Sequence, residues 1–374
     1  MKRLLVAAAL IVASGASSQD RPIAIVDATI LTGAGESIEN GTLVYRQGKI
    51  EAVGRNVDVP GEAERINAEG LFLTPGFIDA HSGFGLRGGG WDRENLSVPD
   101  RDLLQSFAPP TDPPWLRSGV TTTYIGPSGQ NLLGGLGAIV KLTGRIVRSR
   151  AALHASFGET ALDAFEAPTT RQGMIAVLRQ TFIRSQEDAL VGEGGRAVAS
   201  ALAKDIPLRI RVNTRDDILT AIRLAKEFDA QLVVESAVGG HEVASAIATA
   251  GVPVIVGPSI IGIGNGGPYE GFAHTPANAA ELHAAGVTIA LGTFSGRGRS
   301  VAMEGVMVKS HGLTEEATLR ALTLDAATIL GVGDRLGSLE IGKDADLVLW
   351  EGRPLSTWGR TKRVIVDGRT VFSR

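Results

Sequence analysis

The sequence has 374 residues, of which 44% are hydrophobic and 21% are charged, and its formal net charge is −3. A chain of this length can bury a large core and form more than one domain. The nearly balanced charge indicates no nucleic acid or other polyanion as a partner. Because cysteine is absent, disulfides, thiolate chemistry and thiolate metal sites are excluded.

The first 18 residues are predicted to be a signal peptide. Lys2 and Arg3 precede the apolar run LLVAAALIVA, which is too short to span a bilayer. Ala16 and Ser18 place small residues where a signal peptidase cuts. We therefore expect export to the periplasm or out of the cell, with a mature chain that begins near Gln19. The alternative is a buried N-terminal helix. No later run is apolar for long enough to form a membrane helix.

Short strand-like runs occur at both ends of the mature chain. IAIVDATIL, TLVYRQGKIEAVG and ERINAEGLFLTPG lie near its start, with turn dipeptides such as Asn40-Gly41 between them. ADLVLWEG and RVIVDGRTVF repeat this style near the C-terminus. We predict that residues 19–73 and 337–374 together form one small β-sandwich-like domain.

The intervening residues, 74–336, alternate apolar strands with helices. The strand candidates are FIDAH, VTTTYIG, GAIVKLTG, LRIRVN, QLVVESA, VPVIVGP and VTIALGT. The helical patterns among them are RQGMIAVLRQTFIRSQEDAL, DDILTAIRLAKEF, HEVASAIATA and NAAELHAAG. Alternation at this spacing indicates βα units and a parallel sheet. The predicted fold class is therefore α/β, with a closed (β/α)₈ TIM barrel.

Three separated motifs carry a resemblance to a known family. GKIEAVG, GLFLTPGFIDAH and GSLEIGKDADLVLW occur in this order, and together they make the chain similar to the amidohydrolase superfamily. It resembles in particular the imidazolonepropionase and dihydroorotase-like branches and an exported bacterial subgroup. The resemblance implies hydrolysis of a carbon–nitrogen bond in a cyclic amide, dipeptide-like or N-acyl substrate. It also implies a divalent metal such as Zn²⁺ in the barrel mouth, where the metal activates water and polarises the carbonyl.

Most positions that correspond to the family's metal ligands hold other residues here. The His-x-His of the first strand retains its first member, His81, and Glu159 in FGET matches the acid of a middle strand. The positions of the other ligands, three histidines and an aspartate in the family, hold Gly83, Arg211, Ser236 and Phe294. Only His81 and Glu159 keep ligand chemistry among the matched positions. We hypothesise that an ion pair between Arg211 and Glu159 takes the place of the metal.

Two further polar residues are candidates for the barrel mouth. Lys141, in GAIVKLTG, corresponds either to the carbamylated lysine that bridges metals in some family members or to a structural or mouth-lining residue. His274, in FAHTPAN, follows the sixth strand-like run, and it either lines the mouth or is a solvated loop residue.

Two functions remain open from the sequence. The replaced ligands favour a metal-poor pseudoenzyme, without a metal cofactor, that binds a small ligand or pairs with an active amidohydrolase homologue as a non-catalytic subunit. The alternative is an active hydrolase with a remodelled site, in which one metal such as Zn²⁺ is held by His81, Glu159 and loop residues. The metal content of the purified protein distinguishes the two.

Overall fold

The computed structural model describes residues 21–88, 90–110, 114–162, 165, 167–259, 273–295 and 300–374. The predicted signal peptide, residues 1–18, lies outside these ranges, so its export function stays a prediction. Within the described ranges, no helix combines the length and the apolar character that crossing a membrane requires.

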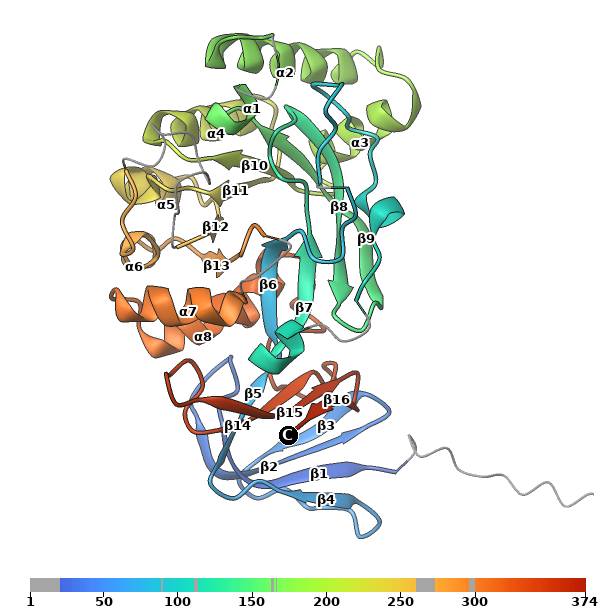
Figure 1. Ribbon diagram of the computed structural model, residues 1–374, viewed down its shortest axis with the longest axis vertical. Coiled ribbons are helices and arrows are strands. Elements are labelled where there is room, and N and C mark those ends of the chain that lie inside the picture. The colour runs from blue at the N-terminus through green and yellow to red at the C-terminus, as the bar shows by residue number, and fades with distance from the viewer. Residues whose placement is uncertain are drawn as a thin grey trace, which may run out of the picture.

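A sheet of eight strands curls into a nearly closed barrel in the upper part of Figure 1. The strands follow one another in chain order around the sheet. They are β6 (Phe77–Ser82), β7 (Val120–Ile125), β8 (Leu133–Lys141), β9 (Ile146–Ser156), β10 (Leu208–Val212), β11 (Leu232–Ser236), β12 (Val254–Val256) and β13 (Ile289–Leu291). The backbone N–H of Phe294 donates to the carbonyl of His81 at 2.9 Å, and this contact joins the segment after β13 to β6.

One barrel strand runs against the others. β8 is antiparallel to both β7 and β9, whereas the remaining neighbours in the sheet are parallel. The connections before and after β8, residues 126–132 and 142–145, are too short for the helix that a parallel crossover needs. The predicted α/β barrel is therefore supported, but the expectation of eight parallel βα units is wrong at β8.

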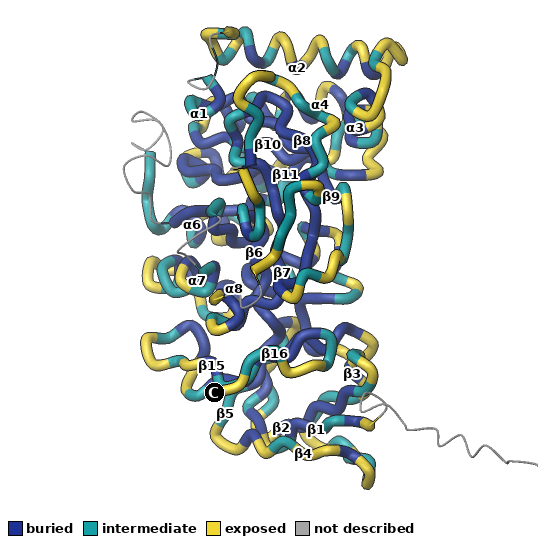
Figure 2. The backbone as a smooth tube through the Cα atoms, turned by 45° about the vertical axis from the view of Figure 1, so that its right-hand side comes forward, coloured by how far each residue is buried: buried dark blue, intermediate teal, exposed yellow. Residues whose placement is uncertain are grey.

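Helices cover the outside of the barrel (Figure 1). They are η1 (Leu103–Ser106), η2 (Pro114–Ser118), α1 (Glu159–Leu162), α2 (Arg171–Gln186), α3 (Gly192–Leu202), α4 (Arg215–Glu227), η3 (Gly240–Val243), α5 (Ala244–Thr249), α6 (Asn278–Ala284), α7 (Val301–Ser310), α8 (Glu315–Leu322) and α9 (Leu324–Ile329). Thr170, Thr214 and Thr314 begin α2, α4 and α8, because each hydroxyl accepts from a backbone N–H of the first turn. Figure 2 shows the barrel strands buried and much of α2 exposed.

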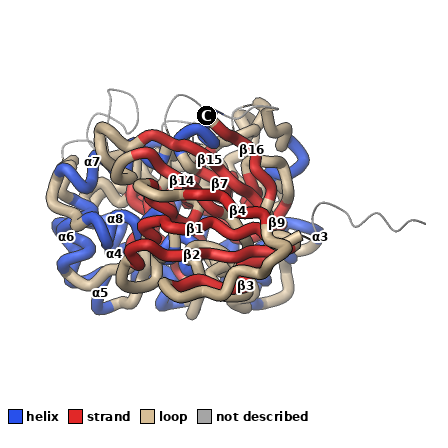
Figure 3. The backbone as a smooth tube through the Cα atoms, turned by 90° about the horizontal axis from the view of Figure 1, so that it is seen from below, coloured by secondary structure: helices blue, strands red, loops and turns tan. Residues whose placement is uncertain are grey.

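Both ends of the chain contribute to a second sheet, which lies below the barrel in Figure 1 and faces the viewer in Figure 3. Its strands are β1 (Ile23–Ile30), β2 (Ile38–Arg46), β3 (Lys49–Gly54), β4 (Glu64–Asn67), β5 (Leu71–Pro75), β14 (Leu347–Glu351), β15 (Arg360–Val366) and β16 (Arg369–Ser373). β14 pairs with β5, with Leu349 opposite Leu73. The strand pairing gives one mixed sheet, so the sandwich-like arrangement is not confirmed. The boundaries at residues 73 and 337 stay a prediction.

A buried ionic cluster joins β8 of the barrel to the second sheet. Nζ of Lys141, a fully buried residue, donates to Asp344 at 3.1 Å, to Asp346 at 3.0 Å and to Asp367. Because β8 is reversed, its C-terminal end lies at the base of the barrel, away from the carboxyl ends of the parallel strands. Lys141 therefore joins the base of the barrel to the second sheet, which agrees with the structural alternative rather than with a position in the mouth.

Candidate functional site

Four polar residues from four barrel strands meet inside the barrel. They are His81 of β6, His154 of β9, Arg209 of β10 and Glu235 of β11, and each is at most 3% exposed. Charged side chains are seldom buried so completely unless they are paired. The contacts among these four residues therefore determine the chemistry of the site.

Glu235 and Arg209 form a buried ion pair at the centre of this group. Oε1 of Glu235 accepts from Nε of Arg209 and also lies 2.9 Å from Nδ1 of His81. Nη2 of Arg209 donates to the carbonyl of Ala80 at 2.8 Å, and its guanidinium carbon lies 3.8 Å from the centre of the Tyr124 ring. The carbonyl and the ring face stabilise the buried cation in addition to the carboxylate.

The pKa shifts in the site agree with an ion pair beside two neutral imidazoles. Burial would raise the pKa of Glu235, but Arg209 and the two histidines hold it well below its ordinary value. Burial lowers the pKa of His81, and it lowers that of His154 to about 4. Near neutral pH, Glu235 is therefore ionised, both histidines are uncharged, and the charges of Arg209 and Glu235 cancel.

Both histidine rings also have partners on their outer nitrogens. Nε2 of His81 lies 3.1 Å from the carbonyl of Pro127, and since this carbonyl and Glu235 both accept, the neutral ring donates to only one of them at a time. The ring also stacks on Phe294 with 4.5 Å between centroids. Nε2 of His154 lies 2.6 Å from the hydroxyl of Tyr124. A ligand that bound either outer nitrogen would have to replace these contacts.

Three residues of this site carry atoms that can bind a divalent metal. His81, His154 and Glu235 offer ligand atoms within 4.8 Å of one another, and no other such group occurs in the described ranges. Their types suit a mononuclear site. However, Arg209 contacts the same carboxylate and cannot lose its proton. A divalent ion here would add two positive charges next to a buried guanidinium. The donor types thus suit a metal, whereas the adjacent guanidinium opposes one.

A second buried carboxylate, Asp79, lies on β6 beside this group. Its oxygens accept from the backbone N–H of Thr293 at 3.0 Å and from the Thr293 hydroxyl at 2.7 Å. Burial raises the pKa of Asp79 to about 7, although these hydrogen bonds act in the opposite direction. Both oxygens are thus occupied in joining β6 to the segment that follows β13.

A cavity of about 740 Å³ opens next to the buried group, at the carboxyl end of β6. His81 and Phe294 line it, together with the exposed Arg87 and a set of glycines. Those glycines are Gly83, Gly85, Gly88, Gly90 and Gly126. A Cβ at Gly126 would approach the His81 ring to 2.6 Å, so this position requires glycine. The volume suits a small molecule.

Similarity to known proteins identifies the family. A sequence profile described as "Amidohydrolase family" matches residues 273–371. The crystal structure of an amidohydrolase from Thermotoga maritima MSB8 is 31% identical in sequence, with a TM-score of 0.88 over 94% of this chain and 100% of that one. The chain belongs to the amidohydrolase family.

Other relatives of this amidohydrolase are more distant. Imidazolonepropionases from Brucella anthropi and Solibacter usitatus are 25% and 28% identical, over 84% of this chain and 87% and 85% of theirs. A prolidase structure complexed with n-methylphosphonate-l-proline is 19% identical with a TM-score of 0.61, and this likeness shows the fold alone.

Four of the site positions predicted from the sequence lie together. Phe294 stacks on His81, and the guanidinium carbon of Arg211 lies 5.2 Å from the centre of the Phe294 ring. Nη1 of Arg211 donates to the carbonyl of Ser128 at 2.6 Å. Gly83 lines the same cavity as His81 and Phe294. The replaced positions after β6, on β10 and after β13 therefore still meet at the mouth.

The other predicted positions are on different elements. Glu159 is the half-buried first residue of α1, and the acid that contacts His81 is Glu235. The proposed ion pair between Glu159 and Arg211 stays a prediction.

Ser236 and His274 line a different, small pocket. The Ser236 hydroxyl donates to the carbonyl of Gly257 at 3.1 Å, and Nε2 of His274 lies 2.9 Å from the carbonyl of Ser259. His274 is thus half-buried in a loop beyond β12 and does not line the larger mouth cavity.

The sequence interpretation missed three of the four central residues. His154 and Glu235 each stand inside an apolar run, AALHASF and QLVVESA, and Arg209 stands between apolar residues in LRIRV. A charged or polar residue in a strand that is otherwise apolar is stable only with a partner. This signal could have indicated that the three residues contact one another.

We expect Tyr124→Phe to lower the free energy of unfolding by about 1–2 kcal/mol, because His154 would lose its 2.6 Å hydrogen bond at a buried nitrogen. Urea denaturation monitored by circular dichroism measures this change. Tyr45→Phe is the matched control, since Tyr45 is equally buried but lies in the second sheet. Equal losses of stability in the two variants would contradict the role of the Tyr124 hydroxyl.

Proposed function

We propose that this amidohydrolase-family protein binds a small cyclic amide or N-acyl ligand at the barrel mouth without hydrolysing it through a resident metal. The observation that carries the proposal is the contact between Arg209 and Glu235. It places a permanent cation against Glu235, the carboxylate that lies with both histidines. The protein would thus be a pseudoenzyme in which an internal guanidinium has the charge-balancing role of the metal.

The mouth cavity supports a ligand of this kind. Its lining combines the apolar faces of Phe294 and Leu86 with Arg87 at the exposed rim. A planar amide can pack against an aromatic ring, and a guanidinium pairs with a carboxylate in two-point geometry. The similarity to imidazolonepropionases also favours a small cyclic amide over a large substrate.

One observation favours the alternative, an active mononuclear hydrolase. Oε2 of Glu235 accepts no hydrogen bond from the described residues, and its separation of 3.4 Å from Nδ1 of His154 is long for one. This oxygen could serve as a metal ligand if Arg209 moved away from the carboxylate. In the alternative based on the sequence, Glu159 is the acid ligand, whereas the acid in contact with His81 is Glu235.

Two further parts of the proposal concern the cellular compartment of the protein and its partner. The basic and apolar N-terminal segment supports export to the periplasm or out of the cell. Pairing with an active amidohydrolase homologue would give a protein of this kind a role as a non-catalytic subunit. Purification of the protein from separated periplasmic and cytoplasmic fractions of the native host tests both parts. The fraction that contains the protein identifies the compartment, and the chains that co-purify with it identify a partner.

The metal content of the protein tests the central proposal. We expect protein purified without added metal to contain far less than one equivalent of zinc, manganese or iron by mass spectrometry. We also expect it not to compete with a chromophoric chelator for added zinc. One tightly bound zinc per chain that is lost in His81→Ala, together with amide hydrolysis, would overturn the proposal in favour of the alternative.

Ligand binding at the mouth has its own test. Calorimetric titration with pyroglutamate and with N-acetylglycine is expected to show binding that Arg87→Met weakens several-fold. Arg184→Met changes an exposed arginine on α2, away from the mouth, and should leave the affinity unchanged. If neither compound binds at millimolar concentration, the proposed ligand class is wrong, whatever the metal content.

A further inference from the structure

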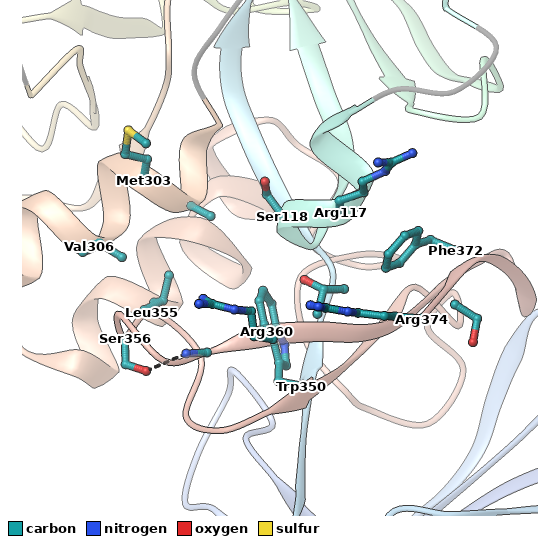
Figure 4. A pocket seen from close by; sticks show the side chains of 14 residues that line it. Arg117, Ser118, Met303, Val306, Trp350, Leu355, Ser356, Arg360, Phe372 and Arg374 are labelled. Atoms are coloured by element: carbon teal, nitrogen blue, oxygen red, sulfur yellow. Dashed lines mark hydrogen bonds between the residues drawn. The ribbon is translucent and has the colours of Figure 1, made fainter.

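A second cavity, of about 680 Å³, lies between the base of the barrel and the second sheet. We call it the barrel–sheet groove. Figure 4 shows its residues: Met303 and Val306 of α7 lie on one side, Phe372 of β16 lies on the other, and Trp350 of β14 lies between them. The groove is formed by segments remote from the mouth cavity, and the two share no lining residue.

The floor of the barrel–sheet groove is apolar and rigidly held. Trp350 and Leu355 are 5% and 6% exposed. The indole N–H of Trp350 donates to the Thr74 hydroxyl at 2.9 Å, and its ring lies 5.3 Å from that of Phe77. A Cβ at Gly119 would approach the Trp350 ring to 2.5 Å, so the glycine allows the ring to sit where it does. A preformed aromatic floor suits an apolar ligand body.

The rim of the groove is basic. Arg117, Arg360 and Arg374 line it, and Figure 4 shows their side chains around the gap between the barrel and the second sheet. Among its lining residues, all of which belong to the described ranges, no side chain is acidic. Glu351, an acid on β14, does not line the groove; it pairs with Arg360 in the strand register, contacts Lys362 at 2.7 Å and also interacts with Arg374. The lining therefore combines three guanidinium groups with an apolar floor.

We propose that the barrel–sheet groove binds a small organic carboxylate with an aromatic or branched alkyl body. The carboxylate would pair with Arg360 and Arg374, since guanidinium groups bind carboxylates through two parallel hydrogen bonds. The apolar body would lie on Trp350 and Leu355. An inorganic anion such as phosphate has no apolar surface to bury against these two side chains, so it should bind more weakly. This site is separate from the mouth and does not depend on the function proposed there.

Calorimetric titration with hydrocinnamate tests the proposal, with hydrocinnamyl alcohol and inorganic phosphate as the two comparison compounds. We expect hydrocinnamate to bind one site per chain, at least about tenfold more tightly than either the alcohol or phosphate. The double variant Arg360→Met/Arg374→Met should weaken hydrocinnamate binding about tenfold and leave the affinity for the alcohol nearly unchanged. Raising the salt concentration should weaken binding of the carboxylate but not that of the neutral alcohol.

Two controls locate the binding. Arg369→Met removes an exposed arginine of β16 that does not line the groove, so it should have no effect. Ala302→Trp fills the groove from α7 and should abolish binding, provided that its melting temperature matches that of the natural chain.

Three outcomes would overturn the proposal: no binding of hydrocinnamate at millimolar concentration, equal binding of the alcohol, or binding that persists in Ala302→Trp. Loss of binding in Arg87→Met rather than in the groove variants would assign hydrocinnamate to the mouth instead.

Discussion

Replacing Arg209 by methionine is expected to lower the free energy of unfolding by about 3–5 kcal/mol and to give the protein a measurable affinity for zinc. The loss of stability follows because Glu235, 1% exposed, would remain as a buried charge without its cation. The gain of zinc binding follows because the carboxylate of Glu235, which lies with His81 and His154, would then lose the guanidinium that contacts it. Urea denaturation and competition with a chromophoric chelator measure the two effects.

Arg211→Met is the matched control for this variant. Arg211 lies two residues further along β10, is only partly buried, and donates to the Ser128 carbonyl rather than to Glu235. It should therefore affect stability less and create no zinc site. The double variant Arg209→Met/Glu235→Gln should recover most of the lost stability, because the uncompensated charge is gone, but it should not bind zinc. If Arg209→Met stays as stable as the natural chain and binds no zinc, the ion pair is not what excludes the metal.

The strand alternation explains why the fold was predictable from the sequence. Apolar runs such as VTTTYIG and QLVVESA became β7 and β11, and the helical pattern DDILTAIRLAKEF became α4. A strand buried on both faces is a run of apolar residues, and a helix buried on one face has apolar residues every three to four positions. Both patterns are visible in the sequence. β9 was missed because its first half, Ile146–Arg150, is polar and partly exposed, so only its second half resembles a buried strand.

The candidate site was predictable only in part, because register and side-chain pairing are properties of the assembled barrel. Arg209 and Arg211 are two residues apart on β10, so they share one face of the strand. Which of the two arginines pairs with a buried acid depends on the neighbouring strands. Arg209 lies opposite His154 of β9, and it contacts the carboxylate of Glu235 on β11. The family pattern directed attention to Ser236, one residue away, and a shift of one residue along a strand exchanges the two faces of the sheet. Burial of a charge was thus a better guide to this site than the expected ligand positions.

Replacing Lys141 by methionine is the second change with a large expected effect. Lys141 is fully buried and contacts three aspartates, so its removal should lower the free energy of unfolding by about 3–5 kcal/mol near neutral pH. Burial acts to lower the pKa of Lys141, but Asp346, Asp367 and Asp344 outweigh it and raise that pKa. Lys49→Met is the matched control, because Lys49 contacts Asp344 at 2.7 Å from a position about half exposed, and its loss should cost at most about 1 kcal/mol.

The effect of Lys141→Met should depend on pH in a defined direction. Burial would raise the pKa of Asp344, but its contacts with Lys49, Lys141 and Arg335 lower it from 3.8 to about 2. Ionised Asp344 therefore stabilises the fold above about pH 4, and this contribution is lost as the pH falls towards 2. Burial raises the pKa of Asp346, so this second aspartate loses its charge earlier as the pH falls. The stability difference between the natural chain and Lys141→Met should hence be largest near neutral pH and shrink steadily below about pH 4. Urea denaturation of both chains across this pH range measures the difference. If the difference stayed constant or grew in acid, Lys141 would stabilise the contact between the barrel and the second sheet by packing rather than by its charge.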